Sequence, residues 1–127
     1  MMLNHYRDRA HSNSVKKGFW NAEILAEELM DAMVEDQGGV IYKLCETVMT
    51  YANPVRYALI QSEVSEALEN DRELDEDFDE ENHAEEMADI LIRVFDYAGW
   101  HDLDLDAAVE KKMAKNESRP PMHGKAY

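Results

Sequence analysis

The stretch "SEVSEALE" (residues 62–69) combines the apolar spacing of a helix with carboxylates on its apolar side. At about 100° per residue, one broad arc collects the apolar side chains of the surrounding segment: Val55, Leu59, Ile60, Val64, Ala67 and Leu68. Glu63 and Glu66 fall inside that arc, while the opposite side is polar. A helix that buries two carboxylates needs a group that neutralises them.

A second acidic pair follows in the next predicted helix, "ENHAEEMADILIRVFDYAGW" (residues 81–100), where Glu86 and Asp89 are also three apart. The first pair lies roughly 8 Å from a helix end near residue 70, and the second roughly 10 Å from a start near residue 81. An antiparallel hairpin would therefore bring four carboxylates together. Mg²⁺ takes carboxylate oxygens as ligands, so the pattern favours a metal site, with Arg93 orienting the acids. A solvated acidic seam containing Glu85, Arg93 and Asp96 would leave the same pattern on the second helix.

The remaining spacing predicts an all-α chain with one domain over residues 1–127, built as a four- to five-helix bundle. The other predicted helices cover residues 3–16, 22–36, 40–52, 53–70 and 105–116. Asn53-Pro54 is a helix start signal, Gly99 ends helix 81–100, and Asp102 or Asp104 caps the last helix. Residues 70–80 and the tail "RPPMHGKAY" (119–127) are predicted loops. The apolar arc of helix 81–98 exceeds half its circumference, which predicts a homodimer or homotetramer.

Composition restricts the function classes. The chain has 28 acidic and 13 basic residues and a formal charge of −15, which argues against nucleic acid or an anionic membrane as partner. No stretch is long enough for a membrane span or typical of a signal peptide, and Cys45 is the single cysteine. We therefore expect a cytoplasmic protein in which Cys45 is a small buried hydrophobic residue.

Two segments, "ALIQSEVSEALEN" (58–70) and "ENHAEEMADILIRVFDYAG" (81–99), resemble the E-x-x-E and E-x-x-D helices of the MazG-like family of all-α nucleoside triphosphate pyrophosphohydrolases. "KKGFW" (16–20) and "VEKKMAKNESRPPMHGKAY" (109–127) resemble its flanking segments, whereas residues 21–52 do not follow the family pattern. The resemblance implies cleavage of NTPs or dNTPs between the α and β phosphates, with Mg²⁺ required and Mn²⁺ as a substitute. It makes Glu63, Glu66, Glu86 and Asp89 the metal-binding acids. Glu63 or Glu66 then becomes the general base, and we favour Glu63.

The resemblance also makes Lys112 and Asn116 contacts to phosphate or sugar, with Lys115 and Arg119 close by. His123 and Lys125 would close over the phosphates from the tail. Lysines near a helix C-terminus also complement its dipole without any ligand. Trp20 either stacks on the base or packs in the core.

Two other readings stay open from the residues alone. The chain could be a non-catalytic acidic interaction protein whose seams bind a basic partner. Glu80-x-x-His83 matches the local pattern of di-iron bundles, but those need a second such motif, which the sequence lacks. His83 is therefore expected on the surface of the first helical turn.

Overall fold

The computed structural model describes residues 2–73 and 79–126, apart from the side chain of His123. Within these ranges all regular structure is helical, which confirms the all-α prediction. The α-helices are α1 (Leu3–Lys16), α2 (Asn21–Ala32), α3 (Val40–Glu73), α4 (Glu80–Trp100) and α5 (Leu105–Glu117). Short 3₁₀ helices cover Val34–Asp36 and Pro121–Gly124. No described helix is both long and apolar enough to cross a membrane.

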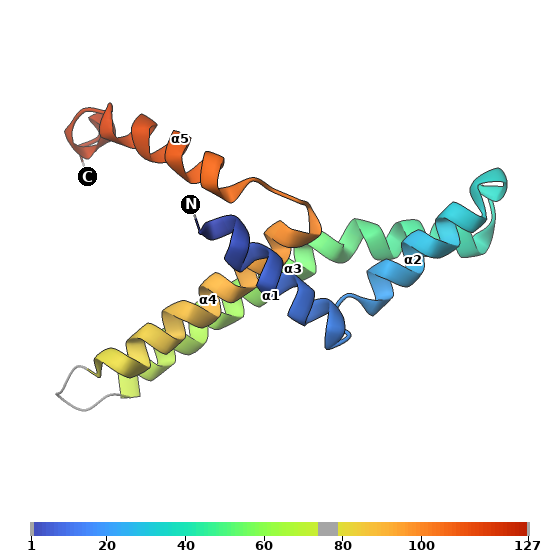
Figure 1. Cartoon of the computed structure of the whole chain (residues 1–127), viewed down its shortest axis with the longest axis horizontal. Helices are drawn as coiled ribbons and strands as arrows, with labels where there is room; N and C mark the ends of the chain where they lie inside the picture. The colour runs from blue at the N-terminus through green and yellow to red at the C-terminus, as the bar shows by residue number, and fades with distance from the viewer. Residues whose placement is uncertain (1, 74–78, 127) are drawn as a thin grey trace.

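The helices form two antiparallel pairs that point in different directions (Figure 1). We call α4 and residues 59–73 of α3 the acidic hairpin, and α2 with residues 40–58 of α3 the arm. α1 packs against α4, and α5 leaves the end of α4 and makes a smaller contact with α1. The arm therefore projects to one side, away from α1 and the acidic hairpin (Figure 1).

The prediction that a new helix starts at Asn53-Pro54 is wrong, because α3 runs through Pro54 without a break. Proline lacks the N–H that would bond to the carbonyl four residues earlier, so it bends a helix more readily than it starts one here. Ala52 is buried, and Asn53 accepts a hydrogen bond from Nε2 of His101 at 2.8 Å. Packing on both sides of Pro54 keeps the two halves helical, and α3 changes direction between the arm and the hairpin (Figure 1).

Other helix ends differ from the predictions in small ways. α2 stops at Ala32, four residues early, and α3 continues to Glu73 into the predicted loop. Of the two proposed caps, Asp104 is the one used, since its carboxylate accepts the N–H of Ala107.

Contrary to the prediction, Gly99 does not end α4. It lies inside the helix, one residue before the last residue. A Cβ added at Gly99 would lie 2.3 Å from Cβ of His11, far inside van der Waals contact. The glycine therefore allows α1 to approach α4 closely.

The core of the described chain is small and lies along the contacts of α1 with α4 and of α2 with α3. Its buried apolar residues are Trp20, Ala26, Cys45, Ala52, Phe95 and Ala98. Burial of Cys45 agrees with its prediction as a small hydrophobic residue. Three polar side chains are buried with them: Glu23, Arg56 and Asp96. The core thus contains charged groups that need internal partners.

Candidate functional site

The register of the acidic hairpin is fixed by two side-chain pairs. Nε of Arg93 donates to Oε1 of Glu63 at 2.7 Å, and Asn70 donates to Glu86. The two pairs lie seven residues apart on each helix, which is about 10 Å along the axis. Glu63 and Glu86 therefore occupy different levels of the hairpin, two helical turns apart.

This register corrects the prediction that the four carboxylates converge. The hairpin forms as expected, but α3 extends further before the turn, so Glu63 meets Arg93 and Glu86 meets Asn70. Glu66 and Asp89 lie at nearly the same level, yet both are exposed. Among the described residues, no three His, Cys, Asp or Glu side chains gather closely enough to hold a metal ion.

Two of the four acids nevertheless face one hollow. It measures about 210 Å³ and lies between α1, the turn after it and the acidic hairpin. Its lining residues are Ala10, Asn13, Ser14, Phe19, Glu63, Asp89, Ile92, Arg93 and Asp96. Glu86 instead lines a separate hollow near the hairpin turn, with Asn70 and His83. Glu66 lines neither of these hollows.

The Arg93–Glu63 pair confirms that Arg93 orients an acid, as predicted. The Glu63 carboxylate is 12% exposed and the Arg93 side chain 31% exposed, so the pair is partly shielded from solvent. Because Arg93 binds one oxygen of Glu63, the other oxygen is the candidate acceptor for a proton from a ligand in the hollow.

Asp96 is a buried residue that lines this hollow, and it was not predicted as a functional candidate from the sequence. Its Oδ1 accepts hydrogen bonds from Nε1 of Trp20 at 2.7 Å and Nδ1 of His11 at 2.8 Å. Its Oδ2 accepts one from Oγ of Ser14 at 2.7 Å. The one signal for it in the sequence is the helical spacing of Asp89, Arg93 and Asp96, which a solvated stripe shares.

Trp20 has a packing role and not the base contact that the sequence allowed. Its indole is 0% exposed, and it stacks on Trp100 with ring centroids 4.4 Å apart. The guanidinium carbon of Arg56 lies 3.7 Å from the centre of the Trp20 ring. Arg56 in turn donates to Glu23 at 2.8 Å and to the carbonyl of Phe19 at 2.7 Å. No ring face of Trp20 is open to a nucleotide, whereas Phe19 beside it is 56% exposed and lines the hollow.

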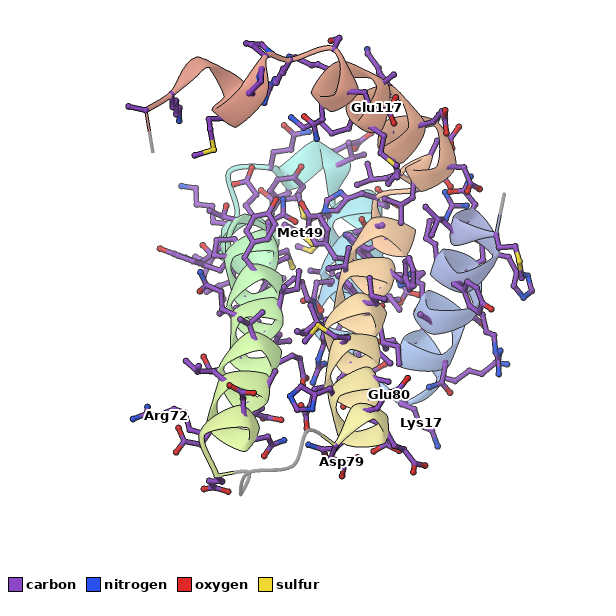
Figure 2. The ribbon with its side chains drawn as sticks, turned by 90° about the vertical axis from the view of Figure 1, so that its left-hand side faces the viewer. Lys17, Met49, Arg72, Asp79, Glu80 and Glu117 are labelled. Carbon is purple, nitrogen blue, oxygen red and sulfur yellow. The ribbon has the colours of Figure 1, made fainter. Side chains whose placement is uncertain are left out.

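None of the described side chains predicted to hold phosphates lines the hollow beside Glu63 and Asp89. Lys112, Lys115 and Asn116 are exposed on α5, Arg119 follows that helix, and Lys125 lies in the tail. Figure 2 places α5, with Glu117, at one end of the hairpin, and Arg72 and Asp79 at the other. The backbone of His123 lies in the last 3₁₀ helix, and its side chain is outside the described residues.

His83 lies in the first turn of α4, as predicted, where it ties the two helices of the hairpin together. Its Nδ1 bonds to the carbonyl of Asp79 at 2.7 Å and its Nε2 to Asp71 at 3.2 Å. The Asp79 carbonyl, followed by the Asp71 carboxylate, raises the pKa of His83 above its usual value of 6.5. These contacts give His83 a structural role, and no second Glu-x-x-His motif exists to support a di-iron centre.

The donor set fits Mg²⁺ in chemistry but not in position. Carboxylate oxygens are hard donors, and all ligands of one such ion must lie about 2 Å from it. The two-turn separation of Glu63 and Glu86 and the exposure of Glu66 leave fewer than three carboxylates at any one point of the described chain. The side chains as they stand therefore do not form a ready metal centre.

Comparison with known proteins adds no relative. No protein-family model matches the chain, and neither a curated protein nor a solved structure is significantly similar to it.

Proposed function

We propose that this chain is a nucleoside triphosphate pyrophosphohydrolase acting on NTPs or dNTPs at the hollow between α1 and the acidic hairpin. The observation that carries the proposal is that Glu63 and Asp89, from two different helices, line one hollow together with Arg93. These are residues of the E-x-x-E and E-x-x-D segments in the order that the MazG-like resemblance requires. Two acids and an arginine at an open hollow can orient a polar ligand and exchange a proton with it.

The proposed reaction is hydrolysis at the α phosphorus. A water oxygen bonds to that phosphorus, the bond from it to the oxygen bridging to the β phosphorus breaks, and pyrophosphate leaves. The water proton passes to Glu63, whose orientation Arg93 fixes through a 2.7 Å contact. The products are a nucleoside monophosphate and pyrophosphate.

Mg²⁺, with Mn²⁺ as a substitute, belongs to the proposal as its expected cofactor. A divalent cation would neutralise the triphosphate, which a chain of charge −15 otherwise repels. The carboxylates that the resemblance implies as its ligands do not gather at one point among the described residues.

The test is a screen of common NTPs and dNTPs with Mg²⁺ or Mn²⁺, in which pyrophosphate and phosphate are measured separately. We expect pyrophosphate release that Glu63→Gln reduces about hundredfold or more while helix content is kept. Glu85→Gln, at an exposed position of α4, is the matched control and should keep full activity. Phosphate without pyrophosphate would contradict cleavage between the α and β phosphates, and no product from any nucleotide would contradict the enzyme assignment.

A second candidate is a non-catalytic acidic interaction protein that binds a basic partner. Its supporting observation is that Glu66 and Asp89 are exposed on the acidic hairpin, within reach of a basic partner. This alternative requires that Mg²⁺ leaves the melting temperature unchanged and that Glu63→Gln leaves partner binding intact. A melting temperature raised by Mg²⁺ in the wild type but not in Glu63→Gln would reject it.

A further inference from the structure

One side of the arm carries a bare apolar stripe on α3. The residues are Ile41, Leu44, Val48, Tyr51 and Val55, at the three- and four-residue spacing of a heptad repeat. Their exposed fractions run from 40% for Val48 to 61% for Tyr51. The stripe therefore has the pattern of a helix–helix contact and has no covering helix in the described chain.

The buried residues of the same segment of α3 lie on a helical face that is next to the stripe but distinct from it. Cys45, Ala52 and Arg56 are the buried residues of α3, and α2 packs against this helix. On a helical wheel they lie about 80° from the centre of the stripe. The arm thus has an apolar face wider than α2 covers, and the uncovered part is the stripe.

The total accessible surface indicates how much covering is missing. The chain exposes 9647 Å², whereas a folded monomer of 14.7 kDa exposes about 6,900 Å². The excess is about 2,700 Å², and a standard protein interface buries about 800 Å² on each partner. The whole chain thus leaves more surface uncovered than one standard interface would bury on it.

Charge decides which partner fits. The helical face of the stripe holds no charged residue from Val40 to Ala58, although the chain carries −15 overall. Two copies repel each other over most of their surfaces, but two such stripes meet without like charges. The arm has seven acidic and two basic residues over positions 21–58, so an anionic membrane is a poor partner.

The stripe also has a definite end. On the same helical face, Ser62, Glu66 and Glu69 follow Ala58 toward the hairpin turn. A partner helix extending past Ala58 would bury these carboxylates, so the contact is confined to the arm.

From this pattern we infer that the arm is a homodimerisation element, in which the stripe on α3 of one copy packs against the same stripe of a second copy across a two-fold axis. Such an interface is self-complementary. Val48 is the middle residue of the stripe, so it lies near its own counterpart whether the two helices run parallel or antiparallel. The stripe is a different surface from the apolar arc of helix 81–98 on which the predicted oligomer rests, and its role does not depend on the proposed enzymatic function.

The first test measures the mass of the full-length chain in solution by light scattering over a range of concentrations. We expect twice the chain mass of 14.7 kDa for the wild type. Leu44→Glu and Val48→Glu should each raise the dimer dissociation constant about hundredfold or more, because a symmetric dimer carries the charge twice. The control is Met113→Glu on α5, at a side chain that is 53% exposed and off the arm. Circular dichroism of each variant separates loss of the dimer from loss of the fold.

The second test is a disulfide cross-link that does not depend on destabilising the dimer. In a Cys45→Ala background, Val48→Cys should give a covalent dimer on treatment with a mild copper oxidant and release monomer on reduction. The Cys45→Ala chain alone has no cysteine and should give none. A monomeric wild type at every concentration would overturn the inference, and so would a dimer that the stripe variants leave intact or that Val48→Cys does not link.

Discussion

The effect of Asp96 on stability can be predicted quantitatively, because this one buried carboxylate accepts hydrogen bonds from three side chains. Asp96 is 6% exposed and Trp20 is 0% exposed. In Asp96→Ala the fully buried Trp20 N–H loses its charged acceptor and has no contact with water, which costs about 1.5–3 kcal/mol of the free energy of unfolding. His11 and Ser14 are partly exposed and can bond to water, so each adds about 1 kcal/mol. The expected loss is about 3–5 kcal/mol of the free energy of unfolding, or roughly 10–20 °C in melting temperature.

The isosteric variant Asp96→Asn separates shape from charge. Its amide oxygen can accept from Trp20 and His11, while its NH₂ group can donate to the Ser14 hydroxyl. We expect a smaller loss of about 1–2 kcal/mol, since only the charge of the acceptor is removed.

The assay is urea unfolding at one fixed protein concentration, followed by circular dichroism and tryptophan fluorescence, because association shifts apparent stability. Glu85→Ala, at an exposed position of the same helix, is the control and should change stability by less than about 0.5 kcal/mol. If Asp96→Ala unfolds at the same urea concentration as Glu85→Ala, Asp96 does not anchor α1 and Trp20 to α4 and the reasoning fails.

Two further predictions follow from single contacts. Gly99→Ala should destabilise the chain more than Ala88→Gly, although alanine favours helix, because the new Cβ would lie 2.3 Å from Cβ of His11. A melting temperature of Gly99→Ala equal to or above that of Ala88→Gly would contradict this close approach. The pKa of Asp104 is held below its usual 3.8, first by the Asn4 side chain and then by the Ala107 N–H, so its carboxylate stabilises the fold above that value and less as pH falls through the folded pKa. Asp104→Ala should therefore lower the melting temperature at pH 7, and its difference from wild type should shrink in acid; a pH-independent difference would show that the charge contributes nothing.

Helix positions were predictable because they depend on local spacing and on end signals. The sequence predicts α1 at residues 3–16, just before "KKGFW", and it predicts α4 to within one residue because the apolar periodicity of α4 is strong. Asp104 was one of two caps considered, and only the folded chain shows which carboxylate reaches the Ala107 N–H. Pro54 and Gly99 were misread because each signal has two meanings, a helix end or a feature inside a helix. Pro54 lies inside a helix because α3 packs on α2, and Gly99 lies inside a helix that packs against His11, more than 80 residues away in sequence.

In the candidate site, too, some features are predictable from local spacing and others depend on how the helices pack. Spacing identified two acidic pairs on neighbouring helices and Arg93 as a partner, and the Glu63–Arg93 contact agrees with this. Spacing could not fix the register, because the point where α3 ends is set by the hairpin turn and by packing, and a shift of a few residues changes which side chains meet. The register instead put Glu63 and Glu86 two turns apart, and it left Glu66 in solvent.

The sequence by itself determined the helical class, most helix positions, the acidic character and the residues that line the hairpin, since each depends on neighbours within a turn or two. Only the tertiary structure decided that Trp20 is a core residue, that Asp96 is the buried acceptor for α1 and Trp20, and that one face of the arm is bare. Those features arise from contacts between segments far apart in the chain, where burial and hydrogen-bond partners are set by how whole helices pack and not by their own residue patterns.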